Sequence, residues 1–283
     1  MNINGYFIFD GFDTRTLPGV TVVRGETLES PAREFDVREI PGRNGNLLLD
    51  NRKYPNTEIT YHVMIRENVE STFRQLAGFL LSRTGYCKLS DSWSTSEFYL
   101  AYVSQPIVPT VSRGDELGTF EVVFNRKPQR FLVSGETEYS NSEYPNTVVV
   151  DNPTYFESRP IIKFTPTSAG LSQHETGFFS VCAHYATVGT GFRLYQDIGF
   201  ILSSSETLGD LVSAGDEIIL DCEARVAVTA SGVDLNNRIS FRDDTQITPV
   251  YDFPAFLPSV RNGILGQYSR VTDIKITPRW WSI

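Results

Sequence analysis

Apolar and polar residues alternate over short stretches along most of the chain, and this pattern predicts β-strands. Many of these stretches end at residues that favour turns, such as the Asp10-Gly11 pair and the loop rich in glycine and asparagine at 41–46. The first half of the chain is therefore expected to consist mainly of short strands. The predicted strands of this half cover 6–9, 20–23, 33–40, 47–49, 59–65, 86–89, 98–103 and 119–124.

One stretch of the first half has the period of an α-helix instead. Its apolar residues recur at every third or fourth position, which places them on one face of a helix. Asn68 is the predicted N-cap, and Arg83 with Gly85 gives the predicted C-terminal stop. The residues of the apolar face are Val69, Phe73, Leu76 and Leu80.

The second half of the chain shows strand and turn patterns alone. Its clearest alternation lies at 218–228, where every second residue from Ile218 to Val228 is predicted to face the same side of one strand. Short strands at regular spacing with turns between them favour a β-sandwich. Further predicted strands cover 160–164, 178–182, 192–194, 200–202 and 271–276.

A polar segment rich in serine, glutamate and asparagine at 134–146 separates the two halves. The length of 283 residues also exceeds the usual size of one domain. We therefore expect domains at 1–134 and 135–283. The 19 phenylalanines and 13 tyrosines favour strands, so the expected class is mainly β: a sandwich or barrel-like first domain with one helix, and a second domain that is a β-sandwich.

The net charge of −9 is divided unevenly between the two halves. Residues 1–134 contain 15 basic and 16 acidic residues, whereas the remainder contains 10 basic and 18 acidic residues. A protein that grips nucleic acid needs a basic surface to neutralise phosphates. The acidic balance therefore predicts no sequence-specific binding of nucleic acid.

Sequence motifs for common catalytic chemistry, such as a P-loop, a nucleophile elbow or a dinucleotide fingerprint, do not occur. The three cysteines are widely spaced, and the three histidines lack partners at metal-ligand spacing. We expect no catalytic residue, no metal and no cofactor. These cysteines and histidines are Cys87, Cys182, Cys222, His62, His174 and His184.

The first residues of the chain lack the basic and apolar regions of a signal peptide. No apolar run approaches the roughly 20 residues that a membrane-spanning helix needs. These features predict synthesis in a cytoplasm and no insertion into a membrane.

Short motifs follow one another in a set order through the first half. FDGFD at 9–13 ends the first predicted strand, and IPGRNG at 40–45 forms the loop between two others. GYCKL at 85–89 and FYLA at 98–101 follow the predicted helix, and GTFEVVF at 118–124 comes after them. As an ordered set, these motifs resemble the distal tail protein (Dit) family of siphophages, the bacteriophages with long, non-contractile tails.

The resemblance continues through the second half. DNP at 151–153 resembles the start of the family's C-terminal domain, and FLP at 256–258, NGI at 262–264 and ITPRWW at 276–281 resemble its end. The ordered set therefore covers nearly the whole chain. It implies that 1–134 is a ring-forming domain and that 135–283 is a galectin-like β-sandwich.

Together with the lack of catalytic motifs, the resemblance implies a structural protein of the virion that is not an enzyme. Members of the family form a hexameric ring that joins the tail tube to the tail-associated tip protein and supports the host-adhesion device. The implied partners are further copies of the chain in one ring or in stacked rings, the major tail tube protein, the tip or tape-measure proteins and a receptor-binding protein. DNA would pass through the lumen, and the implied location is the tail tip of the virion, after assembly in the host cytoplasm.

Two sets of residues are candidates for function within this family. Turn loops of the first domain are the candidate contacts of ring and tube assembly, and an aromatic pair at the C-terminus is expected to pack against the last strand rather than to bind a glycan. The alternative function is a saccharide-binding module for host-surface recognition. A third, an enzyme that degrades cell wall, has no set of residues to support it. The candidate loops are Asp10, Gly11, Pro41, Gly42, Arg43, Asn44 and Gly45, and the aromatic pair is Trp280 and Trp281.

Overall fold

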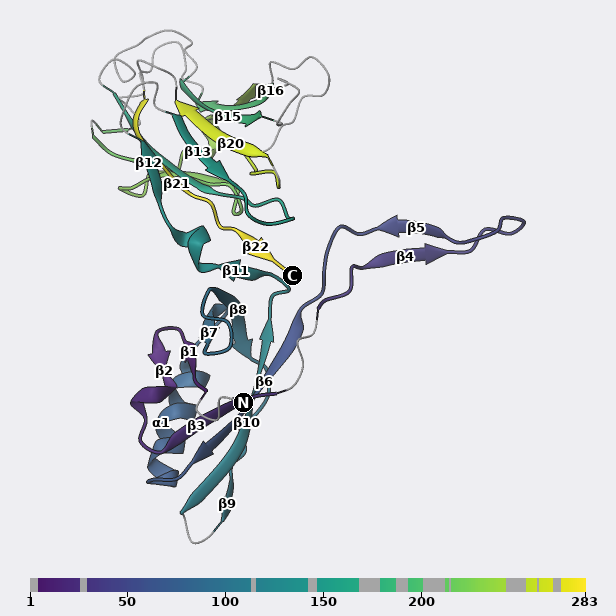
Figure 1. Ribbon diagram of the computed structural model, residues 1–283. Helices are drawn as coiled ribbons and strands as arrows, with labels where there is room; N and C mark the ends of the chain where they lie inside the picture. The colour runs from purple at the N-terminus through teal and green to yellow at the C-terminus, as the bar shows by residue number, and fades with distance from the viewer. Residues whose placement is uncertain are drawn as a thin grey trace. The chain divides into compact units, whose positions relative to one another are not determined.

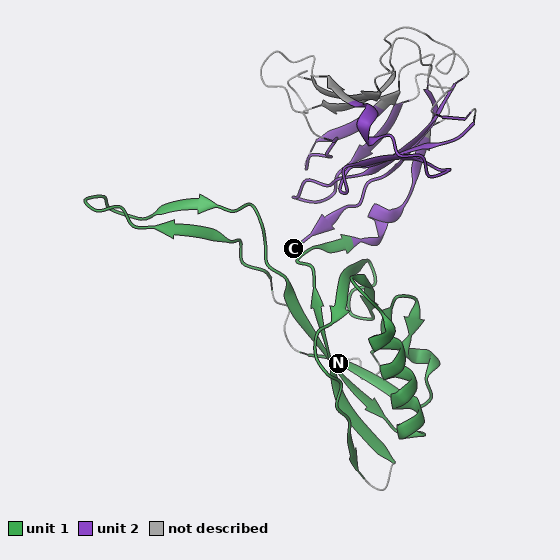
Figure 2. Cartoon of the chain, turned by 180° about the vertical axis from the view of Figure 1, so that it is seen from behind, with its two compact units in different colours: residues 1–131, 283 green, residues 132–282 purple. Residues whose placement is uncertain are grey.

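The computed structural model shows two compact units, which Figure 2 distinguishes by colour. Unit 1 comprises 1–131 with Ile283, and unit 2 comprises 132–282. Both are built mainly from antiparallel strands, so the predicted mainly β class is confirmed. None of the helices in the described residues has the length and apolar character of a membrane span. The structure describes residues 5–25, 30–112, 116–141, 147–167, 179–186, 193–200, 212–213, 215–242, 253–258, 260–266 and 271–283.

The sheet of unit 1 has the strand order β2-β1-β7-β8-β10-β6-β3, with β9 paired to β10 and β11 paired to β8. Its longest pairing joins β6 and β10 over nine residues each, from Thr57 opposite Arg126 to Ile65 opposite Gly118. A short 3-10 helix, η1 (Thr14–Thr16), follows β2. The strands are β1 (Phe7–Phe9), β2 (Phe12–Asp13), β3 (Val20–Arg24), β6 (Thr57–Ile65), β7 (Cys87–Asp91), β8 (Glu97–Val103), β9 (Thr110–Ser112), β10 (Leu117–Arg126) and β11 (Arg130–Leu132).

The sheet of unit 1 curls so that its two halves enclose the core. Three strands separate β1 from β6 in the sheet order, yet the rings of Phe7 and Tyr61 lie 5.1 Å apart. Phe124 of β10 completes the cluster, with its ring 5.6 Å from Phe7 and 5.0 Å from Phe9. Aromatic pairs at these separations are favourable beyond the area that they bury. The aromatic residues of the sequence therefore fill the inside of this curled sheet.

Helix α1 (Val69–Ser82) packs on the core of unit 1 (Figure 1). Val69, Leu76 and Leu80 are buried as the helical period predicts, and Phe73 is partly buried. Asn68 occupies the N-cap position as predicted, but its side chain makes no capping hydrogen bond and its backbone adopts φ 47°. The hydroxyl of Thr72 instead donates to the carbonyl oxygen of Glu67 at 3.2 Å, tying the first turn to the preceding loop.

Strands β4 (Phe35–Arg38) and β5 (Leu47–Asp50) form a separate two-stranded sheet. In Figure 1 this hairpin extends away from the curled sheet of unit 1. The sequence predicted a strand over 33–40, and the observed strand is shorter at both ends. Strands β2 and β9 were not predicted, because each has only two or three residues and no alternating pattern.

Unit 2 is a sandwich of two five-stranded sheets, as the sequence predicts for this half. The first sheet has the order β12-β21-β14-β17-β18, and the second has the order β13-β20-β15-β16-β19. The 3-10 helices in the described residues of unit 2 are η2 (Val133–Glu136) and η3 (Asn236–Arg238), and β22 is Trp281–Ser282. The sheet strands are β12 (Tyr139–Asn141), β13 (Thr147–Asp151), β14 (Ile161–Pro166), β15 (Phe179–Ala186), β16 (Arg193–Phe200), β17 (Ile218–Asp221), β18 (Val226–Thr229), β19 (Ile239–Arg242), β20 (Arg261–Gly266) and β21 (Val271–Thr277).

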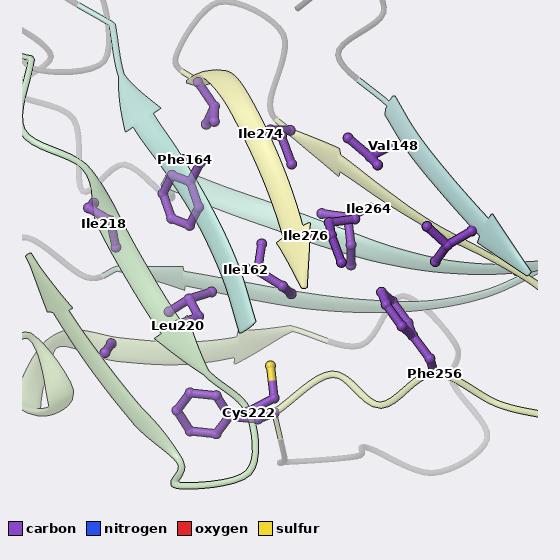
Figure 3. Packing of buried hydrophobic residues seen from close by; sticks show 14 of the residues in the cluster. Val148, Ile162, Phe164, Ile218, Leu220, Cys222, Phe256, Ile264, Ile274 and Ile276 are labelled. Atoms are coloured by element: carbon purple, nitrogen blue, oxygen red, sulfur yellow. The ribbon is translucent and has the colours of Figure 1, made fainter. Parts of the chain in front are cut away.

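The core of unit 2 lies between its two sheets (Figure 3). Ile162 and Phe164 of β14 and Ile276 of β21 come from the first sheet, and Val148 of β13 and Ile264 of β20 come from the second. All five side chains are buried. In β14 these buried side chains alternate with partly buried neighbours, which explains the period of two in the sequence there.

The single strand predicted at 218–228 is wrong. The structure has two strands, β17 and β18, that pair as a hairpin with Ile218 opposite Thr229. Asp221 ends the first strand, because its Oδ1 atom accepts hydrogen bonds from the backbone N–H groups of Glu223 and Ala224 at 3.0 and 2.9 Å. Arg225 then adopts φ 58°, the left-handed conformation that closes the turn.

Two asparagines of the second-half motifs hold loops of unit 2 in place. Asn152 is buried, and its side-chain amide donates to the carbonyl oxygens of Phe156 and Phe256 at 2.8 and 3.3 Å. Asn262 is also buried. Its side-chain oxygen accepts a hydrogen bond from the backbone N–H of Leu257, and its side-chain N–H donates one to the carbonyl oxygen of Leu257. Buried polar groups need such partners. These motif residues therefore fix the backbone of the sandwich.

Candidate functional site

The Asp10-Gly11 turn joins β1 to β2 in a two-residue hairpin loop. Asp10 has φ 48° and Gly11 has φ 82°, the combination that favours a tight hairpin connection. The Asp10 carboxylate lies 3.0 Å from the Nε atom of Arg83, and the backbone N–H of Asp10 donates to the carbonyl oxygen of Lys88 at 2.8 Å. This loop is exposed at its tip and anchored at its base by contacts within unit 1.

The other candidate loop is the tip of the hairpin formed by β4 and β5, which we call the arm (33–54). Gly42 and Gly45 adopt φ 80° and 79°, so both positions need the left-handed conformation that glycine adopts without strain. Arg43 donates its backbone N–H to the carbonyl oxygen of Ile40 at 3.1 Å. Every residue of the tip is exposed, from Pro41 to Gly45.

Ion pairs fix the base of the arm. Arg33 pairs with Asp50 at 2.5 Å, and Lys53 pairs with Glu34 at 3.0 Å. The hydrogen bond from Arg33 lowers the pKa of the Asp50 carboxyl, and that from Lys53 lowers the pKa of the Glu34 carboxyl. Both carboxylates are thus charged at neutral pH, and they hold the two chains of the arm together where it leaves the sheet.

The arm has an apolar face that the described residues do not cover. Phe35 lies opposite Asp50 and Val37 lies opposite Leu48, and residues opposite each other in an antiparallel pair share a face. The exposed fractions of Phe35, Val37 and Leu48 are 45%, 57% and 59%. Within the described residues, the arm's strands pair with each other alone. These three side chains share the face with the carboxylate of Asp50, which lies opposite Phe35.

A groove of about 540 Å³ lies on the sheet of unit 1, and we call it the outer groove. Its floor comes from β3, β6 and β10, mainly from side chains that alternate with the core residues of those strands. His62 and Glu121 lie opposite each other on the floor, with Nδ1 and Oε1 3.3 Å apart. Val108 forms part of the wall and is 73% exposed. Other lining residues include Val23, Met64, Arg66, Pro106 and Val123.

The remaining histidines and cysteines do not gather into a site in the described part of the chain. No group of three or more His, Cys, Asp or Glu side chains suited to a metal ion occurs among the described residues. Cys222 is buried in the core of unit 2, and Cys87 is partly buried on β7. Cys182 and His184 belong to β15, and His174 lies outside the described residues.

The two C-terminal tryptophans differ in their surroundings. Trp280 is 2% exposed and belongs to the core of unit 2, with its ring 5.7 Å from that of Phe256. Trp281 is partly buried, stacks on Phe156 at 4.4 Å, and donates its indole N–H to the carbonyl oxygen of Glu157 at 2.8 Å. A sugar-binding ring needs an open face beside polar partners. The expected role of the pair is packing, with the binding of a saccharide as the alternative, and this role stays a prediction.

The structure keeps the candidate loops apart. The Asp10-Gly11 turn lies at one edge of the curled sheet, whereas the tip at 41–45 belongs to the separate arm. The turn residues of the sequence indicate both loops but not the apolar face of the arm. The available signal was the apolar run 47–49 opposite the alternating residues Phe35 and Val37. That combination indicates a hairpin with an apolar side.

No protein-family model and no curated protein matches this chain. Among solved structures, the chain is similar to the Dit protein (gp 19.1) of phage SPP1, described as a paradigm of the hub adsorption apparatus in phages that infect Gram-positive bacteria. The likeness covers 99% of both chains, with a TM-score of 0.60 and 15% sequence identity. The chain has a Dit-like fold. The resemblance suggested by the sequence motifs is therefore confirmed at the level of the fold.

A baseplate structure of phage p2 in its activated conformation with Sr also resembles the chain. That likeness covers 96% of this chain and 97% of the other, with a TM-score of 0.45 and 8% identity.

Proposed function

We propose that this protein is the hub of a siphophage tail tip, a structural protein of the virion and not an enzyme. The observation that supports this function is the Dit-like fold, which extends over 99% of the chain and so includes both units. In this proposal six copies form a ring that joins the tail tube to the tail-associated tip protein. DNA passes through the lumen of the ring without base-specific contacts.

The proposal assigns ring formation to unit 1. A closed ring of identical subunits needs a heterologous interface, in which two different surfaces of each copy meet. Unit 1 has exposed loops at Asp10-Gly11 and at 41–45, together with the apolar arm, as candidate surfaces for this contact. We assign the arm tip, from Pro41 to Gly45, to contacts with neighbouring copies or with the tail tube. The Asp10-Gly11 turn is the second candidate contact.

The charge distribution supports this division between the units. Residues 1–134 are nearly neutral, so six copies of unit 1 can pack closely without strong repulsion between like charges. The remaining residues carry most of the net charge of −9, which suits a unit that faces solvent. We therefore place unit 2 at the outside of the ring, where it would support a receptor-binding protein. Assembly would occur in the host cytoplasm, before the tail tip is complete.

Electron microscopy of the purified full-length protein, with light scattering for mass, tests the proposal. The expected particle is a six-fold ring with a central hole and six times the chain mass of 31.8 kDa. Stacked rings would give a multiple of this mass and would also agree. A protein that remains monomeric, both alone and when mixed with the tail tube protein of the same phage, would contradict the proposal.

A further inference from the structure

The tripeptide Arg-Asn-Gly occurs twice in the chain, at 43–45 and at 261–263. An asparagine followed by glycine is prone to spontaneous deamidation, because glycine has no side chain to hinder its own backbone nitrogen when that nitrogen attacks the asparagine side chain. Both copies have the same residue on each side of the asparagine, so a difference in their reactivity must come from the fold. A third Asn-Gly pair begins at Asn4, which lies outside the described residues.

The first copy lies at the tip of the arm, between β4 and β5. Asn44 and Gly45 are both exposed. Among the hydrogen bonds of the described residues, none involves the side chain of Asn44 or the backbone N–H of Gly45. A Cβ atom built on Gly45 would meet open space. The attacking nitrogen and the side-chain carbonyl carbon are therefore free to approach each other, and water has access to both.

The second copy lies inside the sandwich of unit 2. Asn262 of β20 is fully buried, and its Oδ1 atom accepts a hydrogen bond from the backbone N–H of Leu257 at 2.8 Å. Its Nδ2 atom donates to the carbonyl oxygens of Leu257 and Val260, both at 3.0 Å. Strand β20 is also paired on both sides, with β13 and with β15. Deamidation of Asn262 therefore requires these bonds to break and this part of the sheet to open.

We propose that Asn44 is a site of spontaneous deamidation and that the fold protects Asn262 from the same reaction. The backbone nitrogen of Gly45 forms a bond to the Cγ atom of Asn44 and loses its proton, and the side-chain nitrogen leaves as ammonia. The product of this step is a cyclic imide. Water then opens one of the two C–N bonds that the ring nitrogen makes with its carbonyl carbons, which gives either aspartate or isoaspartate. Water is the only co-reactant, and nothing is oxidised or reduced.

Either product changes the chemistry of the arm tip. Each adds a carboxylate next to Arg43, and isoaspartate also lengthens the backbone of the tip, because the chain then runs through the former side-chain carbon. The change falls on a loop that the proposed function assigns to assembly contacts. The reaction itself needs only an exposed tip and water, so the inference does not rest on the proposed hub function.

Peptide mapping by mass spectrometry tests the inference on the purified full-length protein. The protein is incubated at neutral pH in water enriched in heavy oxygen, sampled over time and digested in ordinary water, so that conversion during digestion is distinguished by its isotope. We expect Asn44 to convert at least about tenfold faster than Asn262, because a buried residue reacts only through local opening. Equal rates at the two positions, or no conversion at Asn44, would overturn the inference.

The same incubation in urea separates the effect of the fold from that of the sequence. Once both units are unfolded, the two Arg-Asn-Gly tripeptides have similar surroundings, and Asn44 and Asn262 should convert at similar rates. A preference for Asn44 that persists unchanged in urea would show that the fold does not cause it, and would overturn the inference.

Two glycine variants of the tip test the attacking atom. Gly45→Ala places a Cβ atom beside the attacking nitrogen and should slow conversion of Asn44 several-fold. Gly42→Ala is the matched control, because Gly42 has φ 80° and Gly45 has φ 79°, so alanine is equally strained at both positions. Gly42 does not follow an asparagine, and its replacement should leave the rate unchanged. Equal slowing by both variants would overturn the proposed attack by the Gly45 nitrogen.

Discussion

The hydroxyl of Tyr61 donates a hydrogen bond of 2.7 Å to the buried carboxylate of Asp91 inside unit 1. The same carboxylate accepts from the backbone N–H groups of Trp93 and Ser94 at 2.9 and 3.0 Å and lies 3.4 Å from the guanidinium of Arg24. Burial, followed by the charge of Asp91, raises the pKa of Tyr61 well above its ordinary value. Tyr61 thus remains a donor throughout the physiological pH range, and this network links β3, β6 and β7.

Removing the Tyr61 hydroxyl should destabilise unit 1. In Tyr61→Phe the ring still fills the aromatic core, but the buried Asp91 carboxylate loses a donor. We expect a loss of about 1–3 kcal/mol in the free energy of unfolding. Calorimetric unfolding of the full chain measures the change. Tyr102→Phe, at an exposed position of β8, is the control, and an equal effect of both variants would show that the buried bond contributes nothing.

Gly118 permits close contact between β10 and helix α1. A Cβ atom at this position would lie 2.5 Å from the Cγ1 atom of Val69, which is closer than packed carbon atoms approach. Gly118→Ala should therefore cost about 1–3 kcal/mol, because helix and strand must separate. Gly78→Ala is the control within α1: it has open space, and it should stabilise the protein by about 0.4–1 kcal/mol. Urea unfolding distinguishes the two, and a neutral Gly118→Ala would contradict the packing argument.

A charge on the apolar face of α1 should unfold unit 1. Leu76 is fully buried, and in Leu76→Asp an unpaired carboxylate would cost several kcal/mol, on the order of the stability of a whole domain. Leu81→Asp changes the same helix at an exposed position and should have little effect. Circular dichroism during heating measures both. Unaltered melting of the Leu76→Asp variant would show that this face does not support the fold.

The stability of unit 2 should depend on pH through Asp221. Burial by itself raises the pKa of this carboxyl. Hydrogen bonds from Arg279, at 2.7 and 2.8 Å, and from backbone N–H groups have the opposite effect and are stronger, so the pKa is lowered overall. Because the carboxyl pKa is lower in the folded than in the unfolded chain, the carboxylate stabilises the fold above the unfolded pKa of about 3.9. This stabilisation is lost as the pH falls through the folded pKa. Asp221→Asn should thus cost about 1 kcal/mol at pH 7, and this cost should shrink as the pH falls through the lowered folded pKa.

Unfolding of Asp221→Asn in urea at a series of pH values checks this dependence. Asp151→Asn is the control, because Asp151 forms an exposed pair with Arg261 at 3.7 Å. A difference between wild type and Asp221→Asn that is the same at every pH would mean that the carboxylate charge is not what stabilises the turn.

The sequence predicted the elements that have one buried face and one face toward solvent. Strand β6 shows this, because Ile59, Tyr61, Val63 and Ile65 are buried while the residues between them are exposed or partly exposed. Helix α1 was predicted for the same reason. The N-cap position of Asn68 was also predicted, but the lack of a capping bond from its side chain was not, because the sequence did not show that the backbone of Asn68 is left-handed.

The hairpin of β17 and β18 could not be predicted from alternation. Alternating apolar residues continue through 222–225, whereas the break comes from two hydrogen bonds to Asp221 and a left-handed arginine. An Asn-Gly or Asp-Gly turn would have indicated it, but this turn contains no glycine. The candidate assembly loops were located by their turn residues. Their separation and the exposure of the arm depend on sheet pairing between distant segments, which alternation within one segment does not encode.

Hydrogen exchange of the backbone amides of the arm depends on whether another surface covers the arm. Amide hydrogens of 35–38 and 47–50 are held by a single ladder between two exposed strands, whereas those of β6 lie between β3 and β10. In the free chain the arm amides should exchange with deuterium in the low-protection range of local opening, and those of β6 should exchange only with unfolding of the unit. Any surface that covers the arm will slow its exchange and leave that of β6 unchanged. The exchange rate of the arm amides thus shows whether the subunit is alone or assembled.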